Sequence, residues 1–324
     1  MKDGNAEDRL EAAPTPDSLI QSIPTPTPES FAPSNANVAD EADGPKWVEY
    51  SERVTAFVDI LGFKEIVTRS ASGNDPDLIR RIYSALDIGK DDLAKTYAAE
   101  LQLPSSITPK SFDDRFHTFS DCIIISVKPD PLEIGLLVYT IFKICRRLLQ
   151  AGFVSRGGVA MGKLFHRTDE DGSGAPMVFG PAFLQAYALE STHAEGARVI
   201  LQSDLVKFIR EFKKQNEKTR LAKFFTAHIK VAPDGPSFID LFADFPGNCF
   251  YSQELDVTPE MKIIQEKITA ALHDTSDKPT QFRKNAMLAR EFNDAIASAC
   301  KHARSNDLEP FLIPPDVLPP GVGR

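Results

Sequence analysis

The stretch VTAFVDILGF, residues 54–63, decides the fold that this sequence predicts. It opens with an apolar run typical of a buried strand, which we place at about residues 52–58. Asp59 closes that run, and Gly62 marks a turn into a helix. Ile66 and Val67 are expected on the inner face of this helix. A carboxylate is thus predicted at the point where a buried strand ends.

A second strand-end carboxylate, Asp121, follows in a predicted hairpin. Residues 115–127 indicate a strand, a turn at Asp121 and a second, strongly apolar strand. A third segment, RGGVAMG at residues 156–162, lies within a region (153–165) that predicts a strand pair or one long bent strand. The neighbouring strands are expected to bring Asp59 and Asp121 together.

The remaining segments predict an alternation of helices and strands. Helical patterns cover about 78–86, 131–150, 180–191, 204–214, 258–273 and 280–304; strands are expected at 198–201 and within 223–242; loops are expected at 101–114 and 166–176. This order predicts an α+β fold, an α/β sandwich with a mostly antiparallel sheet.

The composition divides the chain into three parts. Residues 1–45 are rich in Pro, Ser and Thr and carry nine acidic and two basic residues, a net charge of −7. Such a segment predicts a disordered tail without a catalytic role, with docking or regulation as the alternative. A catalytic domain is expected at 46–250, and a helical extension with a Pro-rich end at 251–324. The late helices serve as packing faces or, alternatively, as a sensor.

Charge and cysteine spacing exclude several classes of protein. The whole chain has a net charge of −9, so about −2 remains outside residues 1–45, without the basic footprint of a nucleic-acid-binding protein. The four cysteines show no paired spacing, which fits neither a zinc site nor a disulfide framework and favours the cytoplasm. No apolar signal region follows Met1, and the apolar stretch 134–149 is too short and too charged for a membrane span.

Asp59 and its surroundings have the chemistry of a metal and phosphate site. Backbone N–H groups of Gly62, Phe63 and Lys64 would lie at a helix N-terminus, which binds phosphate oxygens well. The carbonyl oxygen of Ile60 is a candidate additional metal ligand. The simpler alternative is a strand-end Asp that caps a helix.

Asp121 and Arg156 strengthen the interpretation. Two carboxylates on adjacent strands can hold two divalent ions, Mn²⁺ or Mg²⁺, against a triphosphate. The Arg156 guanidinium suits two-point contact with phosphate oxygens. The alternatives are a hairpin-turn Asp and a surface salt bridge.

Together these segments resemble the class III nucleotidyl cyclases. The similar segments, in chain order, are FVDILGF (57–63), FSD (119–121), RGGVAMG (156–162), the helix GPAFLQAYALE (180–190) and RVIL (198–201). The resemblance implies a ferredoxin-like or palm-like core and a homodimer in which one chain holds the metals and triphosphate and the other contacts the base. It also implies attack of the 3′-hydroxyl on the α-phosphorus with loss of pyrophosphate.

The residues that read purines in this family are missing. A Lys is expected where His117 stands, and an Asp or Thr where Met177 stands. The family's transition-state Asn and Arg would fall at Leu184 and Ala188. Arg115 is a candidate substitute cation for the developing charge.

The helix at 180–190 is also similar to that of the pyrimidine cyclases of the Pycsar antiphage system. This resemblance implies synthesis of cyclic UMP or cyclic CMP, which activates a partner effector. Phe119, Phe179 and Tyr187, with Met177, are bulky enough to narrow a pocket to pyrimidine size, and Tyr50 joins His117 as a candidate base contact.

Two alternative functions stay open, and a third is disfavoured. An adenylate or guanylate cyclase with an unusual base pocket is the first, and a nucleotide-binding regulator without catalysis is the second. A diguanylate cyclase is disfavoured because no Gly-Gly-Asp/Glu-Glu-Phe hairpin follows Arg156.

Overall fold

The structure, a computed structural model, describes most of the chain between residues 49 and 318. The described residues are 49–73, 75, 77–87, 89–104, 106, 116–167, 177–194, 196–233, 235–246, 250, 257–303 and 307–318. The predicted tail at 1–45 lies outside them, as does most of the loops predicted at 101–114 and 166–176.

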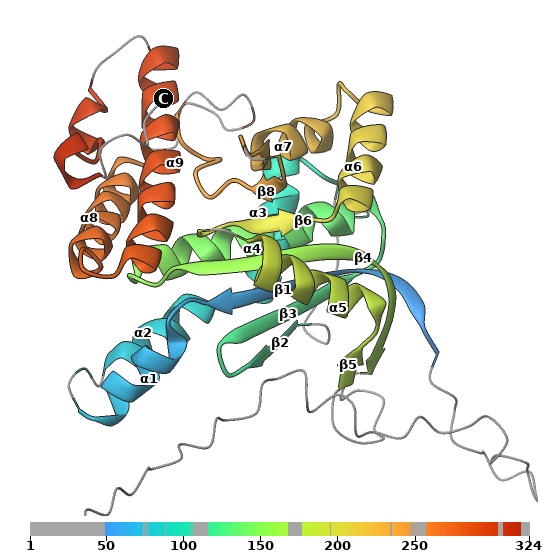
Figure 1. Cartoon of the computed structure of the whole chain (residues 1–324). Coiled ribbons are helices and arrows are strands. Elements are labelled where there is room, and N and C mark those ends of the chain that lie inside the picture. The colour runs from blue at the N-terminus through green and yellow to red at the C-terminus, as the bar shows by residue number, and fades with distance from the viewer. Residues whose placement is uncertain are drawn as a thin grey trace, which may run out of the picture. The chain divides into compact units, whose positions relative to one another are not determined.

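Among the described residues, eight strands form one sheet, in which β1 lies between β3 and β4 (Figure 1). The strands are β1 (Ser51–Ile60), β2 (Phe116–Phe119), β3 (Cys122–Val127), β4 (Ser155–Arg167), β5 (Met177–Phe179), β6 (Val199–Leu201), β7 (Ile229–Val231) and β8 (Ser237–Ile239). The order is β2-β3-β1-β4-β6-β8-β7, with β5 paired to β4. Among the pairings of these described strands, only β4–β6 is parallel. The predicted α+β fold with a mostly antiparallel sheet is therefore confirmed.

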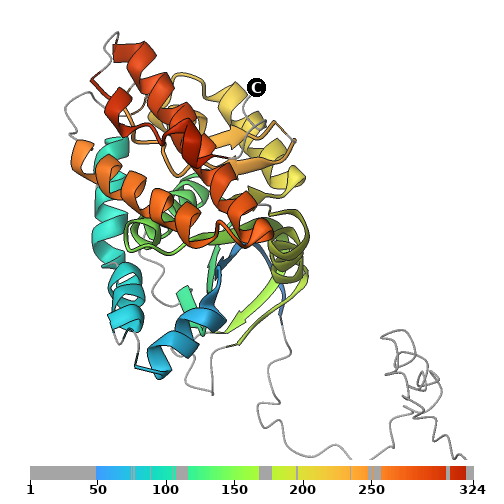
Figure 2. The same ribbon diagram turned by 60° about the vertical axis from the view of Figure 1, so that its left-hand side comes forward.

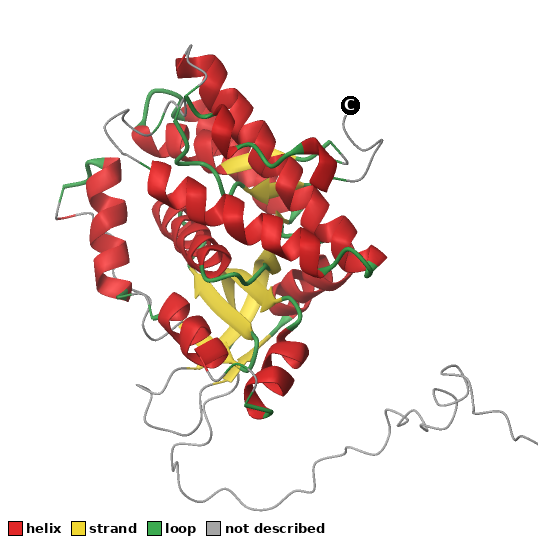
Figure 3. Ribbon diagram, turned by 90° about the vertical axis from the view of Figure 1, so that its left-hand side faces the viewer, coloured by secondary structure: helices red, strands yellow, loops and turns green. Residues whose placement is uncertain are grey.

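The helices gather mainly on one side of this sheet (Figure 3). They are α1 (Phe63–Ala71), α2 (Asp77–Leu86), α3 (Lys90–Leu101), α4 (Pro131–Gln150), α5 (Pro181–Ala188) with the π-helix Leu189–His193, α6 (Ser203–Gln215), α7 (Arg220–His228), α8 (Thr258–Asp274) and α9 (Pro279–Ala303), followed by single 3₁₀ turns at Glu309–Phe311 and Pro315–Val317.

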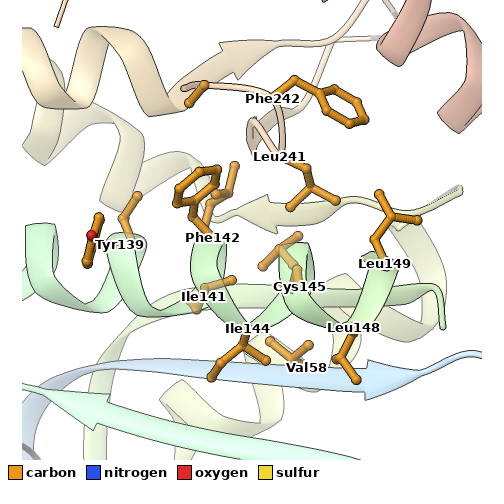
Figure 4. Packing of buried hydrophobic residues seen from close by; sticks show 14 of the residues in the cluster. Val58, Tyr139, Ile141, Phe142, Ile144, Cys145, Leu148, Leu149, Leu241 and Phe242 are labelled. Atoms are coloured by element: carbon orange, nitrogen blue, oxygen red, sulfur yellow. The ribbon is translucent and has the colours of Figure 1, made fainter. Parts of the chain in front are cut away.

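Helix α4 is the centre of the hydrophobic core. Asp130 caps its N-terminus by accepting hydrogen bonds from the N–H groups of Leu132 and Glu133. Ile144 and Leu148 face Val58 of β1, whereas the opposite side of the helix packs under the segment that contains Leu241 and Phe242 (Figure 4). A helix buried on both sides explains why residues 131–150 are apolar almost all round.

Helices α8 and α9 belong to the same core. They lie side by side over α4 (Figure 2), and their buried residues, among them Met261, Ile264 and Phe292, join the cluster that also contains strand residues. The predicted division at residue 250 stays a prediction, but the two late helices do pack on the core.

Helix α5 covers the opposite face of the sheet. A small cluster of Phe57, Ala160 and Ala186 forms this contact, separate from the main core. Gly158 in β4 permits it, because a Cβ there would collide with the carbonyl oxygen of Ala186. Much of α5 remains uncovered, and its Leu184 and Tyr187 are 63% and 50% exposed.

Two expectations about elements are wrong. Residues 220–228 form α7 rather than the first part of a strand region, because Leu221, Phe224, Phe225 and His228 recur at helical spacing and bury one face. Val67 is exposed, and α1 has no fully buried residue; it contacts the core through the partly buried Phe63 and Ile66.

Candidate functional site

Asp59 and Asp121 lie side by side at one end of the central strands. Asp59 stands opposite Cys122 of β3 in the antiparallel register. The N–H of Ile60 donates a 3.1 Å hydrogen bond to the carbonyl oxygen of Asp121. The two carboxyl groups are in hydrogen-bond contact. The sheet therefore brings together the two acids that the sequence singled out.

The hairpin that carries Asp121 has a two-residue loop. Phe119 pairs with Cys122, which leaves Ser120 and Asp121 as its two turn residues. Ser120 has a φ of 57°, a left-handed conformation that corresponds to the first central residue of a type II′ turn. Because the loop is so short, the position of Asp121 is set by the strand pairing itself.

The electrostatic environment of Asp59 opposes its ionisation. Burial raises the pKa of its carboxyl from 3.8 to about 6, and the negative charges of Glu190 and Asp121 add to the effect. The guanidinium of Arg156 acts in the opposite direction. Three acids near one another, with one adjacent cation, form a site that an added positive charge would stabilise.

Arg156 lies between two carboxylates. It pairs directly with Asp59 in the β1–β4 register, and its Nε lies 3.8 Å from Asp59 Oδ2 and 2.5 Å from Glu190 Oε1. Only 23% of its side chain is exposed, so this is no ordinary surface salt bridge. The structure places Arg156 at the site, but held by Glu190 rather than projecting freely toward a phosphate.

Glu190 is a site residue that the sequence reasoning missed. It is 3% exposed and lies in the π-helix that continues α5, a type of helix that often occurs at functional sites. A signal was present: Ala182, Ala186 and Glu190 follow one another at intervals of four residues, so a lone acid stands on the apolar face of the helix.

Helix α1 begins directly beyond Asp59. Gly62 has a φ of 75° and precedes the first helical residue, Phe63. The carbonyl oxygen of Gly62 accepts hydrogen bonds from the N–H groups of Glu65 and Ile66. The first N–H groups of α1, which include those of Phe63 and Lys64, belong to the turn whose donors have no partner within a helix. The N–H groups for which the sequence predicts phosphate binding thus lie next to the acid pair, and their role stays a prediction.

The other predicted site residues lie further away in the same chain. Tyr50 precedes β1 and Asp59 lies near its end, so about nine residue steps of roughly 3.3 Å, or about 30 Å, separate them along the strand. Met177 in β5 pairs with Arg167, at the far end of β4 from Arg156. Arg115 lies outside the described residues.

His117 occupies an intermediate position. It pairs with Ile124, two residues beyond Cys122 in β3, and its Nε2 lies 2.7 Å from Nε2 of His166. The other ring nitrogen of His166 lies 2.6 Å from Ser126 Oγ. His117 is therefore engaged by a partner from β4 on the face of the sheet that α5 covers.

The donor set fits a hard divalent cation. Asp59 and Asp121 offer carboxylate oxygens, and the main chain at Ile60 offers a carbonyl oxygen, which are the ligand types of Mg²⁺ and Mn²⁺. Within the described ranges, no group of three or more His, Cys, Asp or Glu side chains is arranged to hold a metal. A pair of carboxylates is nevertheless the usual protein share for Mg²⁺, since water and substrate phosphates complete its coordination.

The raised pKa of Asp59 predicts a pH dependence of stability in metal-free buffer. Because this pKa is about 6 in the folded protein and 3.8 ordinarily, the folded state binds the proton more tightly. Asp59 should therefore lower the free energy of unfolding by about 2–3 kcal/mol as the pH rises from 4 to 7. Urea titrations across this range measure it, and an Asp59→Asn variant should lack that component of the pH dependence.

Comparisons with known proteins find similarity to solved structures. No protein-family model matches the chain, and no curated protein matches it. The catalytic core of a rhodopsin-guanylyl cyclase with converted specificity, in complex with ATPαS, is 15% identical with a TM-score of 0.36, covering 50% of this chain and 82% of its own.

Two further similar structures are cyclase domains. The guanylyl cyclase domain of the RhoGC fusion protein from the fungus Blastocladiella emersonii is 13% identical, with a TM-score of 0.39 and coverage of 59% and 95%. The adenylyl cyclase CyaB from P. aeruginosa is 14% identical, with a TM-score of 0.35 and coverage of 59% and 93%. These are cyclases of adenine and guanine nucleotides, but likeness at this level carries no argument about the substrate of the present chain.

Proposed function

We propose that this protein is a metal-dependent nucleotide cyclase that converts a pyrimidine nucleoside triphosphate, UTP or CTP, into its 3′,5′-cyclic monophosphate and pyrophosphate. One observation carries the proposal: Asp59 and Asp121 meet at the end of paired antiparallel strands, directly before the N-terminus of α1. The resemblance of the sequence segments around these residues to class III cyclases supports it.

The residues at this end of the sheet have distinct roles in the proposed reaction. Asp59, Asp121 and the Ile60 carbonyl would hold two Mn²⁺ or Mg²⁺ ions, which supply a lowered pKa at the attacking hydroxyl and charge neutralisation at the leaving phosphate. N–H groups at the start of α1 orient the phosphates. The 3′-oxygen bonds to the α-phosphorus and gives up its proton to solvent water, while the bond from the α-phosphorus to the bridging oxygen breaks and pyrophosphate leaves with the electron pair.

Arg156 is proposed to orient Asp59 as well as to contact phosphate. Its ion pair with the buried Glu190 holds the guanidinium beside Asp59. A cation held between two acids limits the rotamers that Asp59 can adopt, and so presents its free oxygen toward the metal. Glu190 is then a positioning residue that acts through Arg156.

The choice of a pyrimidine rests on the positions where purine cyclases carry polar base readers. His117 and Met177 stand at those positions, and Leu184 and Ala188 stand where the family's transition-state Asn and Arg would fall. A site that lacks the hydrogen-bonding groups for a purine should lose purine selectivity by orders of magnitude. The role of the cyclic product as a signal to an effector in antiphage defence rests on the Pycsar resemblance alone.

A homodimer would reunite the separated site residues. Tyr50 and Met177 lie too far from Asp59 to contact the same triphosphate within one chain, yet a second copy would supply them if active sites lie at the interface. Exposed apolar side chains on this face favour such an interface: Leu184 and Tyr187 on α5, and Phe119 at the hairpin turn, are 63%, 50% and 76% exposed.

Mixing two inactive variants tests the shared site. Asp59→Asn removes a metal ligand and Tyr50→Ala removes a base contact, so each homodimer should be impaired. In a mixture at equilibrium, about half of the dimers are heterodimers with one intact site, which should restore about a quarter of wild-type activity. No restoration, with both variants still dimeric by light scattering, would contradict a site shared between chains.

Competition among the four triphosphates tests the substrate. With Mn²⁺ present, UTP or CTP should be consumed ahead of ATP and GTP, and the product should be a cyclic monophosphate. Preferential turnover of ATP or GTP would favour a purine cyclase. Tight triphosphate binding by calorimetry without turnover would favour the regulator, for which Leu184 and Ala188 are the motivating residues.

The cytoplasmic setting remains a proposal from cysteine usage. Within the part of the chain that the structure describes, no helix is long and apolar enough to cross a membrane.

A further inference from the structure

A basic hollow lies between helices α6 and α7, apart from the residues of the candidate active site. Its volume is about 500 Å³, and its lining comprises Arg210, Lys213, Lys214, Glu217, Ala222, Lys223 and Thr226. Four of these side chains are cations and one is an acid. Such a volume accommodates a small molecule.

Cations outnumber acids in the lining of the hollow, and ion pairs among the described residues do not engage them. Among the ion pairs of the described residues, none involves Arg210, Lys213, Lys214 or Lys223. Burial lowers the pKa of Lys213, and the neighbouring charge of Arg210 lowers it further. The cations are therefore close enough to destabilise one another, and an anion would relieve that repulsion.

Helix dipoles do not account for this arrangement. Lys213 and Lys214 lie in the last turn of α6, where positive charge is favourable. Lys223, however, is the fourth residue of α7 and faces the unfavourable, positive end of that helix, whose first turn contains no acid. Positive side chains from two helices thus converge where one helix begins.

We propose that this hollow binds a small molecule with two or more phosphate groups, at a site separate from the proposed cyclase centre. Lysine and arginine side chains bind phosphate oxygens through charge-assisted hydrogen bonds. Several cations around one hollow select a ligand that carries several negative charges over a single phosphate.

The charges come from the two helices that meet at the hollow, so an occupant would bridge α6 and α7. Helix α6 contacts β4, the strand that carries Arg156. An anion bridging the helices would therefore stabilise the packing behind that strand without contacting the substrate. The expected effect of binding is a higher unfolding temperature.

Calorimetric titration of the full-length protein with tripolyphosphate, in metal-free buffer of low ionic strength, tests the proposal. Without metal the proposed cyclase centre keeps Arg156 beside its acid pair, and that guanidinium is already ion-paired with Glu190. Wild-type protein should bind one tripolyphosphate per chain. A Lys213→Gln/Lys223→Gln variant, which loses one cation from each helix, should bind at least about tenfold more weakly.

A matched variant distinguishes binding at the hollow from a general effect of the protein's net charge. Lys262→Gln/Lys301→Gln removes two exposed cations from α8 and α9 and should bind like the wild type. If Lys213→Gln impairs folding by circular dichroism, Lys214→Gln/Lys223→Gln replaces it, since both lysines are exposed. Equal weakening in hollow and control variants, or no saturable binding by the wild type, would overturn the proposal.

Discussion

Replacing Asp59 by Asn should lower cyclase activity by about 10³-fold or more, while making the metal-free protein more stable. The loss follows because metal coordination contributes several kcal/mol to transition-state stabilisation. The gain follows because the pKa of Asp59 is raised to about 6 by burial, Glu190 and Asp121, so its charge is unfavourable in the folded state at pH 7. Removing that charge should raise the free energy of unfolding by about 2–3 kcal/mol.

An exposed aspartate provides the control for both effects. The side chain of Asp204 is 64% exposed and forms an ion pair with Lys207 within one turn of α6. Asp204→Asn removes the same charge elsewhere, so activity should stay unchanged and stability should change by less than about 1 kcal/mol. An Asp59→Asn protein that is both active and no more stable would contradict the metal site. It would also contradict the unfavourable charge of Asp59 in the folded state.

Replacing Asp244 by Ala should produce a large loss of stability in the core. Arg146 of α4 is 2% exposed and donates hydrogen bonds from Nη1 to the Leu241 carbonyl oxygen at 2.6 Å and to Asp244 Oδ1 at 3.0 Å. Its guanidinium also lies over the Phe245 ring, 4.9 Å from the centroid. Without Asp244 the buried positive charge loses its close carboxylate, which should cost about 3–5 kcal/mol in free energy of unfolding.

The second acid on the same guanidinium distinguishes burial from simple ion pairing. Glu260 of α8 lies 3.3 Å from Nη2 of Arg146, but its side chain is 48% exposed. Glu260→Ala should therefore lower the free energy of unfolding by no more than about 1 kcal/mol, as urea titration of the two variants can measure. Equal losses would mean that the Asp244 pair is as well solvated as the Glu260 pair.

The sequence predicted the elements whose signals are local. The strand that ends at Asp59 and the hairpin around Asp121 are marked by apolar runs and turn residues, and both are present. The long helix at 131–150 is present with the predicted bounds. Helix α7 overlaps the region 223–242 in which the sequence predicts strands, although Phe224, Phe225 and His228 have helical spacing.

The sequence was sufficient to predict the site residues that lie at strand ends. It was not sufficient to predict how far apart residues at opposite ends of a strand lie. Asp59 and Asp121 meet because antiparallel pairing fixes their neighbours. The separation of Tyr50 from Asp59 follows from the full length of β1, which was predicted shorter at both ends. Glu190 reaches Arg156 only because the π-helix packs against β4, a contact that no local pattern reports.

The most direct test of the central claim is mass detection of products after purified protein is incubated with Mn²⁺ and ATP, GTP, CTP and UTP in separate reactions, with Asp121→Ala as the control. The proposed function predicts cyclic UMP or cyclic CMP together with pyrophosphate, and loss of both in the control. A cyclic product that persists in Asp121→Ala, or no cyclic product from any of the four triphosphates, would contradict it.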